Sequence, residues 1–119
     1  MSSQEGWIGV DLDKTIAYYT HWEGADKVGA PLPEMVKRVH DWLNSGVKVR
    51  IFTARVFAPV HNAKRQREAA VSMIAIQDWC QKHLGVVLPV TCVKDQDMIE
   101  IWDDRAKQVI PNTGLPVKE

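Results

Sequence analysis

Four short apolar segments, interrupted by longer amphipathic ones, constrain the fold of this chain more than any other feature. Residues 7–12, 47–53, 86–93 and 98–102 are rich in hydrophobic and β-branched side chains and have the length of buried strands. Segments of helical length separate the first three of them. This order predicts an α/β fold, with a three-layer, Rossmann-like arrangement and helices packed on a mostly parallel central sheet.

Both helical segments carry start and stop signals. Pro33 suits the first position of a helix, and Gly46 follows its apolar stripe. Asn62 can cap a second, longer helix that ends at Gly85. Residues 16–31 have no hydrophobic period, so we expect a loop or a short flap there. The residues expected on the inward face of the long helix are Ala70, Met73, Ile74, Cys80 and Leu84.

Length and composition exclude several classes of protein. A chain of 119 residues is long enough for one core, so a single domain over residues 1–119 is expected. Its 15 lysines and arginines balance 15 aspartates and glutamates, so any binding of nucleic acid would have to be local. No apolar run approaches the roughly 20 residues of a membrane helix. No signal peptide is recognisable, and we expect a cytoplasmic protein without a membrane partner.

Reactive polar side chains follow every predicted strand. They are Asp11 and Asp13 after the first, Thr53 and Arg55 after the second, Lys94 after the third, and Asp103 and Asp104 after the fourth. Either acidic pair alone could be a solvated turn. In parallel sheets, however, ligands collect beyond the carboxyl ends of the strands, and this topology would bring both pairs to one edge. The sequence therefore predicts a single site with as many as four carboxylates.

Such a site needs a counter-charge. Two carboxylates about 4 Å apart repel by roughly 4 kcal/mol at an effective dielectric constant near 20. A divalent cation removes this cost, and an all-oxygen set of ligands suits Mg²⁺. A carboxylate can also attack a phosphoryl group, and a second one can transfer the proton of the leaving group. These properties predict a metal and phosphate site.

Four motifs in sequence order carry a resemblance to a known family. VDLDKTI, IFTAR, VKD and IWDDRA resemble the motifs of the haloacid dehalogenase superfamily of phosphatases. The similarity is closest to small members without a cap domain, including short phosphatase-like proteins of bacteriophages. The resemblance implies that Asp11 is the nucleophile and a Mg²⁺ ligand, and that Asp13 is the general acid and base and touches the metal through its carbonyl. Asp103 and Asp104 would complete the metal site.

The resemblance also implies a set of phosphate-binding groups. Thr53, with the amide of Ala54, would hold the phosphoryl oxygens, and Lys94 would steady the phosphoryl group. Arg55 lies two residues beyond Thr53, and we expect it to bind the substrate as well. Two positions depart from the family: Asp95 follows Lys94 where proline is frequent, and Lys14 stands where many members have glycine. A less sharp turn is expected there.

Substrate and activity are left open at this stage. The leading hypothesis is a phosphatase that acts on a nucleotide, a nucleic-acid end or a sugar phosphate; a receiver-like or catalytically silent phosphate- and metal-binding module is the alternative. Residues 16–32 are too few for a cap domain, so an open site on a monomer or homodimer is expected. Tyr18, Tyr19 and Trp22 offer either a surface for stacking a base or sugar, or a small satellite core that holds the flap.

Overall fold

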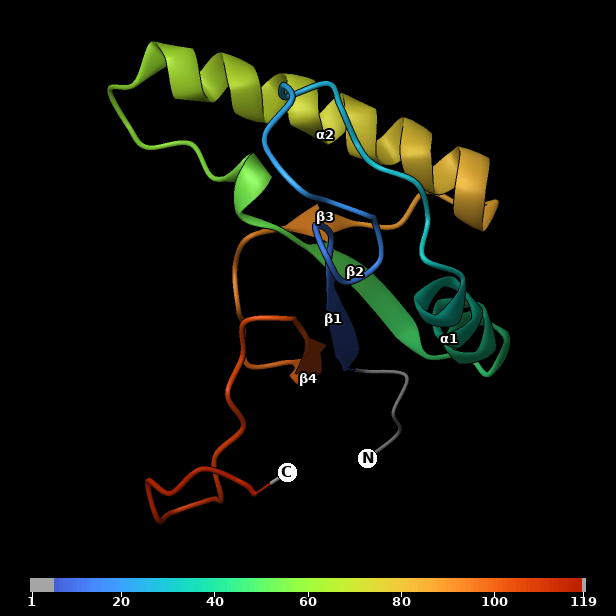
Figure 1. Ribbon diagram of the computed structural model, residues 1–119, viewed down its shortest axis with the longest axis vertical. Coiled ribbons are helices and arrows are strands. Elements are labelled where there is room, and N and C mark those ends of the chain that lie inside the picture. Colours follow the sequence, from blue (N-terminus) through green and yellow to red (C-terminus); the bar gives the residue numbers. More distant parts are fainter. Residues whose placement is uncertain (1–5, 119) are drawn as a thin grey trace.

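The computed structural model describes residues 6–118 and contains, within them, a four-stranded parallel sheet and two α-helices (Figure 1). The elements are β1 (Trp7–Asp11), α1 (Pro33–Asn44), β2 (Lys48–Phe52), the 3-10 helix η2 (Ala54–Val56), α2 (Ala63–Leu84), β3 (Val90–Thr91) and β4 (Met98–Trp102). The strand order is β3-β2-β1-β4, and every neighbouring pair is parallel. The predicted α/β class and the parallel sheet are confirmed, and the arrangement is compatible with a Rossmann-like fold.

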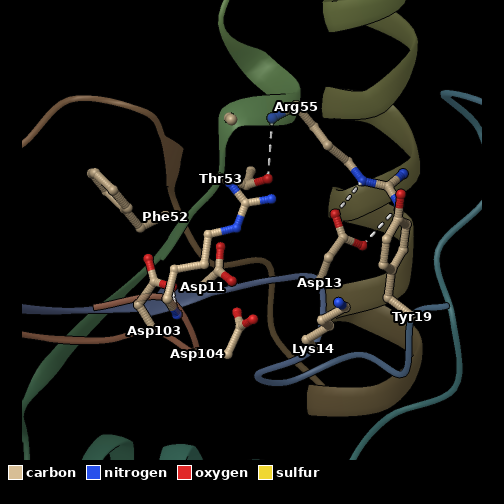
Figure 2. A pocket seen from close by; sticks show the side chains of 11 residues that line it. Asp11, Asp13, Lys14, Tyr19, Phe52, Thr53, Arg55, Asp103 and Asp104 are labelled. Carbon is tan, nitrogen blue, oxygen red and sulfur yellow. Dashed lines mark hydrogen bonds and ion pairs between the residues drawn. The ribbon is translucent and has the colours of Figure 1, made fainter. Parts of the chain in front are cut away.

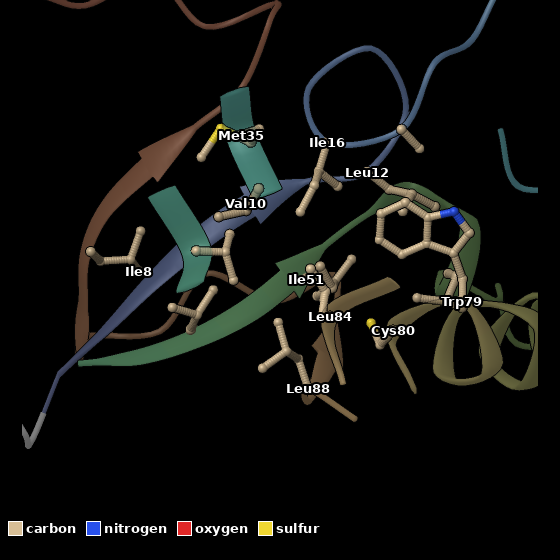
Figure 3. Packing of buried hydrophobic residues seen from close by; sticks show 14 residues of the cluster. Ile8, Val10, Leu12, Ile16, Met35, Ile51, Trp79, Cys80, Leu84 and Leu88 are labelled. Carbon is tan, nitrogen blue, oxygen red and sulfur yellow. The ribbon is translucent and has the colours of Figure 1, made fainter. Parts of the chain in front are cut away.

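The core lies between one face of the sheet and both helices (Figure 3). Ile8 and Val10 alternate along β1 toward this face, and the parallel register places them beside Val49 and Ile51 of β2. The helices complete the same buried cluster with Met35 and Val39 from α1 and with Ile76, Trp79, Cys80 and Leu84 from α2. Each large apolar side chain buried here contributes about 1.5–3 kcal/mol. This packing fixes the strand ends that carry the acidic residues.

Within residues 6–118, the opposite face of the sheet is covered by side chains and by the connection from β3 to β4, and not by a helix. Trp7 is buried there, with the guanidinium carbon of Arg50 4.5 Å from its ring centroid. Its indole Nε1 donates a 2.8 Å hydrogen bond to Asp95, in the connection from β3 to β4. Residues 92–97 of this connection contain no helix, and they cross the sheet because β3 and β4 are its two edges. The predicted third layer is therefore not confirmed by the described residues.

The predicted helix signals are confirmed. Pro33 is the first residue of α1, and Gly46, with a φ of 82°, follows its end. The side chain of Asn62 accepts a 3.0 Å hydrogen bond from the amide of Arg65 and so caps α2. Gly85 ends α2 in the left-handed conformation, which glycine adopts without steric cost. Among the described residues, neither long helix has the length and apolar character that spanning a membrane requires.

The predicted inward face of α2 is correct at its carboxyl end only. Cys80 and Leu84 are buried, whereas Ala70, Met73 and Ile74 are exposed or half-buried. Before Cys80, the inward face of α2 includes Ser72 and Trp79, and the flap of residues 16–31 runs along this part of the helix. The Ser72 hydroxyl donates to the carbonyl of Ala25 at 3.0 Å, and the Trp79 indole donates to that of Gly29 at 2.8 Å. The buried positions Ala69, Ser72, Ile76 and Trp79 keep helical spacing, so the predicted face was offset by about one residue in this half of α2.

The third predicted strand is much shorter than expected. Of residues 86–93, only Val90 and Thr91 pair, next to Ile51 and Phe52 of β2. Pro89 has no amide hydrogen to donate, although its carbonyl accepts a 2.9 Å hydrogen bond from Ile51. After Thr91 the chain leaves the sheet and returns to begin β4 at the opposite edge. This early departure decides where Lys94 lies.

Candidate functional site

A pocket of about 260 Å³ opens at the carboxyl edge of the sheet (Figure 2). Its lining combines acidic, cationic and hydroxyl side chains from the ends of β1, β2 and β4. These residues are Asp11, Asp13, Lys14, Tyr19, Phe52, Thr53, Ala54, Arg55, Asp103, Asp104 and Arg105. The edge predicted to collect polar groups thus holds nearly all of the predicted site residues.

Three of the carboxylates form a tight cluster. Oxygen atoms of Asp11, Asp103 and Asp104 lie within 4.8 Å of one another. Asp11 is the last residue of β1, and the other two follow β4 directly, with Val10 paired to Trp102 in the parallel register. Acids from the two ends of the chain therefore meet because β1 and β4 are neighbours that end at the same edge.

Crowding and burial change the acidity of Asp11. Its burial, its hydrogen bond with Asp104 and the negative charges of Asp103, Asp104 and Asp13 together raise the pKa of Asp11 to about 7. The hydroxyl of Thr15 lies 3.5 Å from an oxygen of Asp11 and 3.5 Å from one of Asp104. Sequence reasoning missed Thr15 as a site residue, although it lies in the same turn as the first acidic pair.

Asp13 faces away from this cluster. Both of its carboxylate oxygens accept hydrogen bonds from Arg55, at 2.8 Å from Nε and 2.8 Å from a terminal nitrogen. Arg55 is 7% exposed, and its other terminal nitrogen donates to the carbonyl of Lys27 at 2.6 Å. Three of the five N–H groups of Arg55 are therefore used within the protein, and its side chain still lines the pocket, where the sequence predicts it. The side chain of Asp13 is separate from the predicted metal ligands.

The flap contributes aromatic side chains beside this ion pair. The guanidinium carbon of Arg55 lies 5.0 Å from the ring centroid of Trp22. Tyr19 lines the pocket, and a smaller adjoining cavity of about 100 Å³ shares Tyr19 and Arg55 with it. Tyr18 is 60% exposed, which does not fit a satellite core. Trp22 instead links the flap to Arg55.

Thr53 and Ala54 lie where the sequence predicts. Thr53 directly follows β2, is almost fully buried, and accepts a 3.2 Å hydrogen bond from the amide of Arg55. Ala54 begins η2 at the pocket wall. Because β2 pairs with β1 so that Phe52 lies beside Asp11, Thr53 is next to the acidic cluster.

Lys94 is not brought into the pocket. It is exposed, and its neighbour Asp95 binds Trp7, which begins β1. Trp7 and Asp11 are separated by about 13 Å along a strand that rises about 3.3 Å per residue. Lys94 lies outside the pocket because the chain leaves the sheet early, directly after Thr91 of β3. The cationic side chains that line the pocket besides Arg55 are those of Lys14 and Arg105.

The turn after β1 is sharper than predicted. Lys14 has a φ of 72°, in the left-handed region, which costs a residue with a Cβ atom about 1–2 kcal/mol. The carbonyl of Leu12 accepts hydrogen bonds from the amides of Ile16 at 3.1 Å and Ala17 at 2.9 Å, and closes the turn. Ile16 and Ala17 are fully buried, so the packing on either side holds Lys14 in this conformation.

No protein-family model, no curated protein and no solved structure matches this chain.

Proposed function

We propose that this protein is a Mg²⁺-dependent phosphatase of the haloacid dehalogenase type, which hydrolyses phosphomonoesters through an aspartyl-phosphate on Asp11. The observation that carries the proposal is the cluster of Asp11, Asp103 and Asp104 beside Thr53 at the carboxyl edge of the sheet. Three carboxylates this close need a cation or protons to offset their repulsion. The order of the four sequence motifs supports the same family.

The donor set fits Mg²⁺. All three side chains offer oxygen, and their ligand atoms lie within 4.8 Å of one another. Mg²⁺ binds oxygen at about 2.0–2.1 Å in octahedral geometry, so its ligands lie about 3–4 Å apart and the cluster needs to contract only slightly. When bound, the ion would neutralise these carboxylates and draw charge from the phosphoryl oxygens. Asp11, Asp103 and Asp104 are the residues that would hold it.

The remaining groups then have distinct tasks. An oxygen of Asp11 attacks phosphorus and forms an acyl phosphate, while the bond from phosphorus to the ester oxygen breaks. Asp13 gives a proton to that leaving oxygen and later takes one from the water that hydrolyses the intermediate. Both oxygens of Asp13 accept hydrogen bonds from Arg55, so Asp13 must open one of these bonds and take up a proton from solvent before it can protonate the leaving oxygen. The hydroxyl of Thr53 and the amide of Ala54 hold the phosphoryl oxygens.

The proposal is tested by hydrolysis of p-nitrophenyl phosphate, with and without Mg²⁺. We expect turnover that needs Mg²⁺, stops with a chelator and falls about 10³-fold or more in Asp11→Asn. Asp78→Asn removes an exposed acid of α2 and serves as the matched control, which should keep full activity.

Two other results would point to the alternatives. Incubation with acetyl phosphate that leaves a long-lived phosphate on Asp11 indicates a receiver-like module. Binding of Mg²⁺ and phosphate without any turnover indicates a silent binding module. A wild-type protein that binds neither Mg²⁺ nor beryllium fluoride would contradict the proposal itself.

A further inference from the structure

The cationic side chains at the pocket are not equivalent. Arg55 already donates to both oxygens of Asp13 and to the carbonyl of Lys27. Arg105 and Lys14 are both exposed and both line the pocket, and Arg105 lies just beyond the acidic pair at the end of β4. Lys94, the lysine indicated by the sequence motif, is absent from the lining of the pocket. Lys14, in contrast to Lys94, lines the pocket, and it belongs to the turn that also carries Asp13.

The backbone of Lys14 is unusual for its residue type. Its φ of 72° lies in the region that glycine occupies freely and that lysine avoids. The buried side chains of Ile16 and Ala17 fix the turn, so a glycine at position 14 would relieve strain without changing the fold. Strained residues of this kind are concentrated at functional sites, where a side chain is needed at a set position.

We propose that Lys14 binds the transferring phosphoryl group, in the role that the sequence motif assigns to Lys94. This inference depends on the proposed function. Figure 2 shows Lys14 beside Asp13, among the side chains that line the pocket. Its flexible four-carbon stem lets the ammonium group adjust to the phosphoryl oxygens. Since Arg55 is paired with Asp13, Lys14 and Arg105 are the further side chains of the lining that supply the positive charge a dianionic phosphoryl group requires.

Three substitutions separate the charge of Lys14 from its strain. Lys14→Gly removes both, Lys14→Asn removes the charge while asparagine tolerates the left-handed region, and Lys14→Arg keeps both. His61 provides a matched backbone control, because it is exposed, has a φ of 70° and lies outside the lining of the pocket.

The measurements are the dissociation constant of inorganic phosphate and the KM for p-nitrophenyl phosphate, both with Mg²⁺, and the thermal unfolding midpoint. We expect Lys14→Asn and Lys14→Gly to raise the dissociation constant and the KM about 10- to 100-fold, because a charged hydrogen bond is lost. Lys14→Arg should stay within a few-fold of wild type. Lys14→Gly and His61→Gly should both raise the unfolding midpoint, by about 3–6 °C, while His61→Gly leaves phosphate binding intact.

Failure of this inference is distinguishable from failure of the proposed function. A wild-type protein without Mg²⁺-dependent turnover would overturn the proposed function. A wild-type protein that turns over, with Lys14→Asn retaining the same KM and the same affinity for phosphate, would overturn only the role of Lys14. A loss in Lys94→Ala as large as that in Lys14→Asn would also overturn it.

Discussion

Arg55→Met is expected to lower the free energy of unfolding at pH 7 by about 3 kcal/mol, because it leaves the carboxylate of Asp13 without its partner. The two side chains are 6% and 24% exposed, so water replaces the lost hydrogen bonds poorly. The substitution also removes the donor to the carbonyl of Lys27 and the cation over the ring of Trp22. Urea unfolding of wild type and variant measures the difference.

Arg38 offers a matched control for this prediction. It makes the same three kinds of contact, with the carboxylate of Glu34 at 3.9 Å, the carbonyl of Glu34 at 3.2 Å and the ring of Trp102 at 5.5 Å. Its side chain is 46% exposed and that of Glu34 is 91% exposed. Because exposed ion pairs contribute little, Arg38→Met should cost less than about 1 kcal/mol.

The double variant Arg55→Met with Asp13→Asn tests the physical cause. If Arg55→Met is destabilising because it leaves the carboxylate of Asp13 unpaired, removing that charge should recover about half of the lost free energy of unfolding or more. An effect of Arg55→Met no larger than that of Arg38→Met would contradict the prediction. So would equal costs in the single and double variants, since the loss would then come from packing alone.

The parts of this molecule that the sequence predicts are those that depend on local periodicity and on one rule of sheet topology. Alternating or continuous apolar residues indicated β1, β2 and β4, and cap residues such as Asn62 and Gly85 indicated the ends of α2. The meeting of Asp11 with Asp103 follows because parallel strands end at one edge. None of these inferences needs knowledge of side-chain partners.

The remaining features depend on contacts between distant residues. Asp13 and Arg55 are separated by 42 positions, and although the pairing of β1 with β2 brings their strand ends together, the sequence does not indicate that the two side chains bind each other. The position of Lys94 after a predicted strand did not indicate its place in the fold, because β3 ends after two residues and the chain turns back. A less sharp turn was expected at Lys14, whereas the residue is left-handed, because its buried neighbours override the preference of the lysine itself.

The second large effect concerns pH and Asp11. Without metal, we expect the wild-type protein to lose stability relative to Asp11→Asn as the pH rises from about 4 to about 7. The pKa of Asp11 is about 7 in the folded protein, whereas an unfolded aspartate has a pKa near 3.9. Between these values the folded state holds a proton that the unfolded state has released, so rising pH favours unfolding.

The size of this effect follows from linkage. A rise of the Asp11 pKa from 3.8 to about 7 corresponds to at most about 4 kcal/mol of stability. Because Asp11 is only partly buried, solvent screening reduces the expected value to about 1–2 kcal/mol. Asp11→Asn should therefore be more stable than wild type by this amount at pH 8 in a chelator, and nearly equal to it at pH 4. Urea unfolding at both pH values gives the two differences, with Asp78→Asn as the exposed control.

Adding Mg²⁺ at pH 8 should reverse the order of stability. Ligand binding stabilises the folded state by an amount that grows with the logarithm of its affinity, and an ion held by Asp11, Asp103 and Asp104 would offset the repulsion that raises the pKa of Asp11. Asn at position 11 weakens that binding, so Mg²⁺ should stabilise the variant less than the wild type. An Asn variant that is less stable than wild type in the chelator would show that the carboxylates do not repel one another in the folded protein. In that case the argument that their proximity favours a cation would lose its basis.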